Sequence, residues 1–151
     1  MRLRMLRRLA ITVVCVSLPA LASSSAFAQG GKPLHANLSG ANEVPVLGDP
    51  DGTGFAVIRV NPGQGTVCYD ISVSNVDPIL AAHIHIGGAG VPGAVVVPLP
   101  PLGGQITGCT SGVDRDLALA IMKNPEAYYV NVHNSAFQGG AARGQLEPGF
   151  Q

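Results

Sequence analysis

Alternation of apolar and polar residues is clearest over residues 66–73. There Val67, Tyr69 and Ile71 alternate with polar or small residues, which is the period of two of a strand buried on one face. A second apolar run, Gly54–Val60, precedes it across a turn rich in Pro and Gly. Together the two runs predict a β-hairpin.

Short apolar runs separated by Gly and Pro continue along the rest of the chain. One segment, Asp114–Lys123, instead has apolar residues at helical spacing, and Asn124-Pro125 after it is a natural helix stop. This pattern predicts an all-β fold, an antiparallel Greek-key β-sandwich with one short helix near residues 114–123. The remaining predicted strands are Leu34–Leu38, Ala81–Ile86, Ala94–Val97, Gln105–Cys109, Tyr128–His133 and Ala142–Leu146.

Residues 1–28 have the three parts of a secretory signal peptide. A basic start precedes the apolar run Leu9–Leu21, and Ala26-Phe27-Ala28 is a small-residue cleavage site. The alternative is an N-terminal anchor helix, but the apolar run is short for a bilayer. We therefore expect an exported protein, periplasmic or secreted, with no membrane span once residues 29–151 are released.

Composition narrows the classes of partner. The chain is 46% hydrophobic and only 12% charged, which is too apolar for a disordered protein. Four of its nine Lys and Arg residues lie in the leader, so the released chain has five basic and nine acidic side chains. The released chain is therefore acidic and has no basic run, which argues against a nucleic-acid partner.

Loss of the leader removes Cys15 and leaves Cys68 and Cys109. Two thiols in an exported chain usually pair, so we expect a disulfide. Alternation places Cys68 on the face away from the aliphatic residues, so Gln105–Cys109 should run beside its strand. The alternative, a pair of metal thiolates, lacks C-x-x-C spacing.

Three phrases in a fixed order resemble the CHRD domain, the module named after chordin. The resemblance covers Leu34–Leu146 and implies one CHRD-like β-sandwich domain over residues 29–151, secretion, and little settled biochemistry. With no nucleophile elbow or phosphate loop in the chain, our first functional hypothesis is a non-enzymatic module that binds an unknown protein or envelope component. The phrases are LSGANEVP at 38–45, AHIHIG at 82–87, and YVNVH at 129–133 followed by RGQL at 143–146.

Glu43, Asn131 and Arg143 stand in these phrases and are candidates for structural or partner contacts. Glu43 either contacts a metal or partner, or satisfies a turn and pairs with Arg143. The family usually shows Gly-Gly-Glu before its last strand, whereas this chain has Ala141 at the acidic position. The resemblance therefore leaves open which carboxylate accompanies Arg143.

Histidines provide the second hypothesis, a metal-binding protein. His83 and His85 are two apart and share one face of their strand. His133 lies on the face of its strand away from Val130 and Val132, and His35 is similarly placed. Three converging imidazoles suit copper(II) or zinc, with His35 or water as a fourth ligand. The alternative is that these rings only form hydrogen bonds over the sheet.

The His-x-His strand and the later Val-His strand end also resemble the copper ligands of the copper/zinc superoxide dismutases. The predicted sandwich is thus either immunoglobulin-like or superoxide-dismutase-like, and the resemblance implies a third functional hypothesis, a redox enzyme. The sequence has no bridging histidine and no zinc loop after the His-x-His strand. The resemblance therefore supports the shape of a site more than the activity.

Overall fold

A computed structural model describes residues 31–101 and 106–149. The predicted leader at 1–28 and the first residue of the predicted strand Gln105–Cys109 lie outside the described residues. All predicted strands and the predicted helix are present. The strands are β1 Lys32–Ser39, β2 Thr53–Asn61, β3 Thr66–Ser74, β4 Ile79–Ile86, β5 Val95–Pro98, β6 Ile106–Ser111, β7 Tyr128–Asn134, β8 Ala142–Gln145 and β9 Glu147–Pro148. The helix α1 spans Arg115–Lys123, and 3-10 turns η1 and η2 span Gly40–Asn42 and Pro125–Ala127.

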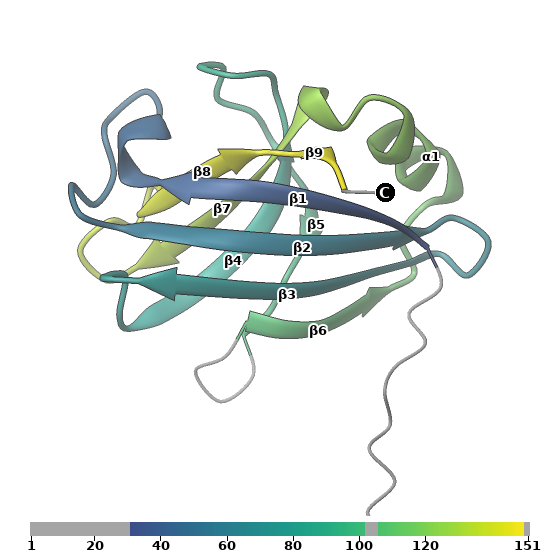
Figure 1. The fold of residues 1–151 in the computed structure, drawn as a ribbon, viewed down its shortest axis with the longest axis horizontal. Helices are drawn as coiled ribbons and strands as arrows, with labels where there is room; N and C mark the ends of the chain where they lie inside the picture. Colours follow the sequence, from purple (N-terminus) through teal and green to yellow (C-terminus); the bar gives the residue numbers. More distant parts are fainter. Residues whose placement is uncertain (1–30, 102–105, 150–151) are drawn as a thin grey trace, which may run out of the picture.

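The predicted all-β antiparallel class is confirmed. The described strands form one nine-stranded sheet in the order β5-β4-β7-β8-β1-β2-β3-β6, with β9 beside β1. This sheet curls into a nearly closed barrel, with β1, β2, β3 and β6 in front of β4, β5 and β7 in Figure 1. The two layers expected of a sandwich are thus continuous, and they meet where Ser39 of β1 pairs with Arg143 of β8.

The aliphatic faces of the strands point inward, as alternation requires. Leu34, Ile58 and Ile84 have no exposed surface. Helix α1 adds Ala118 and Ile121 to this core. The described residues contain no helix long and apolar enough to cross a bilayer.

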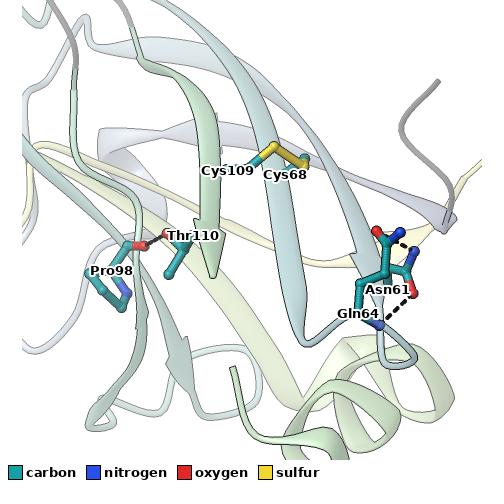
Figure 2. Close-up of a disulfide and its surroundings, with 6 residues drawn as sticks. All are labelled: Asn61, Gln64, Cys68, Pro98, Cys109 and Thr110. Atoms are coloured by element: carbon teal, nitrogen blue, oxygen red, sulfur yellow. Dashed lines mark hydrogen bonds between the residues drawn. A yellow bond between two sulfur atoms is a disulfide. The ribbon is translucent and has the colours of Figure 1, made fainter. Parts of the chain in front are cut away.

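The predicted disulfide is confirmed between neighbouring strands β3 and β6. Cys68 and Cys109 stand directly opposite each other in the ladder, on the outside of the barrel (Figure 2). Nearby, the Thr110 hydroxyl donates to the Pro98 carbonyl oxygen at the end of β5. This contact links the two edge strands of the sheet, β5 and β6. Beside it, the Tyr69 hydroxyl of β3 donates to the Pro100 carbonyl oxygen after β5 at 3.0 Å.

Candidate metal centre

Strands β4 and β7 bring three histidines together on the outer face of the sheet. His83 and His85 alternate with Ala82 and Ile84, whose side chains enter the core. On the antiparallel neighbour β7, His133 lies opposite Ala81. Adjacent strands and a shared face therefore place the three rings side by side, as the alternation predicts.

The three imidazoles are close enough to share one ion. One ligand atom from each of His83, His85 and His133 lies within 4.8 Å of the others. The shortest separation joins Nδ1 of His83 and Nε2 of His133, 3.1 Å. The ring centroids are 5.0 Å apart for His83 and His133 and 5.6 Å for His83 and His85.

Backbone carbonyls orient two of the rings. Nδ1 of His85 donates to the Gly93 carbonyl oxygen, and Nδ1 of His133 donates to the Gln138 carbonyl oxygen, both at 2.9 Å. A carbonyl only accepts, so each Nδ1 carries the proton and each Nε2 presents a lone pair. Nε2 of His85 is buried and has no hydrogen-bond partner. A buried, unsatisfied lone pair is costly unless a proton donor or a metal meets it.

The electrostatic environment keeps these rings neutral. Burial, with repulsion from His133 and His85, lowers the pKa of His83 from 6.5 to about 4. Burial also lowers the pKa of His85 and of His133, although each bonded carbonyl opposes the shift. Neutral imidazole is the form that binds metals, so the group is in its ligating form at neutral pH.

His35, the fourth histidine, is not brought to this group. Its Nε2 lies 3.3 Å from the Glu147 carboxylate, and its ring stacks on Phe55 with centroids 5.9 Å apart. In the part of the chain that the structure describes, the metal-ligand group consists of the three other histidines. Of the two expected fourth ligands, water and His35, the structure does not bring His35 to the group, because β1 lies beyond β7 and β8 in the sheet.

Glu43, Asn131 and Arg143 form a buried polar layer next to the histidines. Only 2–3% of each residue is exposed. Along the sheet, Asn131 stands between His83 of β4 and Arg143 of β8. Its Nδ2 donates to Oε2 of Glu43 at 3.2 Å. This layer therefore connects the histidine strands to the loop after η1.

Arg143 holds the loop between β4 and β5 over the sheet. Its Nη2 donates to the carbonyl oxygens of Gly88 and Val91 at 2.8 and 2.9 Å. Its guanidinium carbon lies 3.4 Å from the ring centroid of Tyr129, whose ring stacks on His85 at 4.8 Å and 11°. The row Arg143, Tyr129, His85 thus crosses β8, β7 and β4 and ends at a candidate metal ligand.

Glu43 is the buried carboxylate that interacts electrostatically with Arg143. Ala141 stands at the position where the sequence resemblance led us to expect a Glu. Burial raises the pKa of Glu43 to about 7, against lowering by Arg143 and Asn131. A Cβ at Gly140, where φ is +148°, would lie 2.5 Å from this carboxyl group. The glycine therefore makes room for the Glu43 side chain.

The sequence identified the histidines but missed the groups that orient them. Gly93 and Gln138 act through backbone carbonyls, which no residue type reveals. Tyr129 carried a signal, since it precedes His133 by four positions on the same strand face, but stacking on His85 depends on which strand lies next to β7.

Comparison with known protein families matches residues 34–146 to the family described as CHRD domain. The match has the same limits as the resemblance expected from the three phrases. Comparisons with curated proteins and with solved structures return no match.

Proposed function

The chain belongs to the CHRD domain family, and we propose that this member is an exported, non-enzymatic protein that binds one copper or zinc ion through His83, His85 and His133. One observation carries the proposal. The three neutral imidazoles converge, and the buried Nε2 of His85 has no partner in the protein. The disulfide supports export, because such bonds persist in oxidising compartments.

The separation of the ligand atoms fits a bound ion. Two nitrogens bound to a tetrahedral ion at 2.0–2.1 Å lie about 3.3 Å apart, close to the 3.1 Å between His83 and His133. His85 would bind through Nε2, with its Nδ1 bond to Gly93 retained as the outer-shell contact that such ligands commonly make. A fourth position stays available to solvent.

Calorimetric titration of metal-stripped protein tests the proposal. With copper or zinc at pH 7.5, we expect one equivalent to bind with Kd below about 10 μM, as three histidine ligands allow. The variant with His83→Ala and His85→Ala should lose this binding, whereas the His35→Ala control should keep it. Equal binding by wild type and the double variant would contradict the proposal.

A second candidate function is a protein-binding or envelope module, favoured by an apolar groove. The groove, of about 410 Å³, lies between the loop Val44–Leu47 and residues 136–140. Val46 and Leu47 are 76% and 68% exposed. Pull-down from the native envelope should recover a partner with wild type and lose it with Leu47→Asp. Equal recovery by both proteins would count against this groove.

A superoxide-dismutase-like activity has less support. The described residues hold one metal-ligand group, and His35 adds no second one. If copper-loaded protein removes superoxide no faster than free copper, the non-enzymatic proposal stands.

A further inference from the structure

The histidine group contains no negatively charged ligand. Its members are three neutral imidazoles, and no carboxylate of the described residues belongs to it. A divalent ion bound there would keep its full double charge in a partly buried position. Desolvation of charge is costly unless a counter-charge compensates it.

The buried charge that does act on the group is positive. Arg143 is 2% exposed, and its guanidinium lies 3.4 Å above Tyr129. His85 stacks on the same ring, and β7 stands between β4 and β8 in the sheet. The cation is therefore separated from a candidate metal ligand by one aromatic ring, where water cannot screen it.

The nearby carboxylate compensates this cation only in part. The Glu43 carboxylate accepts its side-chain hydrogen bond from Asn131 and not from Arg143, and Oε1 of Glu43 and Nη1 of Arg143 are both buried without a partner. Burial raises the pKa of Glu43 to about 7, so its carboxylate is charged at pH 8 and offsets Arg143 in part. Its bonded oxygen contacts Asn131, whereas the guanidinium lies against the Tyr129 ring on which His85 stacks. The cation is therefore the charge that contacts a metal ligand through an aromatic ring.

We infer that the centre binds Cu(I) in preference to Cu(II) and Zn(II), and that the buried guanidinium of Arg143 determines this preference. The inference rests on the proposed function and names its metal. One positive charge is easier than two to hold beside a fixed cation. Arg143 acts through space and through Tyr129, as a positioning residue.

Affinities for Cu(I), Cu(II) and Zn(II) test the inference on the full mature protein at pH 8. Competition with chromophoric chelators gives each Kd, with Cu(I) handled without oxygen. Wild type should bind Cu(I) at least about tenfold more tightly than Cu(II). In Arg143→Gln the ratio of Cu(I) to Cu(II) affinity should fall about tenfold, which is about 59 mV in the one-electron potential.

Three further variants separate charge from structure. Arg143→Lys keeps the charge and should keep most of the ratio. Glu43→Gln removes a negative charge with little change of shape and should raise the ratio. Arg115→Gln removes an exposed cation from α1, where the side chain is 70% exposed, and should leave the ratio unchanged. If circular dichroism shows that Arg143→Gln does not fold, the ratio of Cu(I) to Cu(II) affinity in Glu43→Gln decides the inference.

The outcomes are distinguishable. Failure of wild type to bind any of the three ions overturns the proposed function itself. Binding with Cu(II) tighter than Cu(I), or with a ratio that neither Glu43→Gln nor folded Arg143→Gln changes, overturns only the inference about Cu(I). Opposite shifts in these two variants, with an unchanged Arg115→Gln control, support it.

Discussion

On the outer face of β3, Asp70 and Ser72 are open to solvent, whereas on the outer face of β7 and β8 Asn131 and Arg143 are covered by loops. The first face is secured by a covalent bond between Cys68 and Cys109. The second face is secured by hydrogen bonds from buried side chains to loop carbonyls. One sheet thus carries a solvent-exposed surface and a buried polar site, because loops of the described residues fold over the second face.

The polar face is where a single substitution should cost most. Arg143→Ala leaves the Gly88 and Val91 carbonyl oxygens and the Glu43 carboxyl group without their cationic neighbour. We expect a loss of about 3–5 kcal/mol in the free energy of unfolding, as for other broken buried ionic contacts. Urea unfolding measures it. Arg115→Ala, an exposed control, should change stability by less than about 0.5 kcal/mol. Similar stabilities for both variants would remove the contrast between the faces.

The disulfide face should show a smaller loss and no effect on the site. The bond closes a separation of 41 residues, so loop entropy predicts a loss of about 2–4 kcal/mol in the variant with Cys68→Ser and Cys109→Ser. Metal affinity should stay within about twofold of wild type, because the histidines lie on other strands. An unchanged melting temperature would show that the bond contributes nothing. A lost metal site would show that the two faces are coupled.

The smallest expected effect is a shift in the pH of metal release. Ordinary imidazoles, with a pKa near 6.5, meet strong proton competition by about pH 5. The pKa of His83 is about 4, so this ring stays neutral further into acid. Metal binding should therefore persist at pH 5 and fall only towards pH 4. The same lowered pKa means that the apo fold keeps this contribution to stability above pH 6.5 and loses it as pH falls towards 4. Titrations at pH 7.5, 5 and 4 measure the affinities, and complete release at pH 6 would contradict the prediction.

The sequence predicted what depends on periodicity and missed what depends on loops. The period of two placed Val67 and Tyr69 inward and Cys68 outward, and it placed His83 and His85 on one face. These are local consequences of a strand, so short-range pattern suffices. The contact between Asn131 and Glu43 joins residues 88 apart, and no local rule specifies it.

His35 also shows that local periodicity does not reveal which strands are neighbours. Its position in β1 satisfies the alternation that selected the other histidines. The order of strands decides whether two outward residues meet, and that order places β8 between β1 and β7. The side of the sheet on which a residue lies can thus be predicted from its own strand, whereas its neighbours on that side depend on the order of all the strands.

The narrow junction between β8 and β1 has a consequence for how the native protein opens. The ladder between these strands consists of the pair Ser39 and Arg143, with the Asn42 side chain donating to the Arg143 carbonyl oxygen at 3.2 Å. Beyond a gap in the pairing, β9 adds two more pairs with β1. Neighbouring ladders such as β1 with β2 are eight residues long. Amide hydrogen exchange should therefore divide the barrel into two cooperative units along this line. Arg143 takes part in both units, because its backbone pairs with β1 and its side chain holds the loop beside the histidines. Opening of the unit that contains β1 should therefore also loosen the loop at the histidine site.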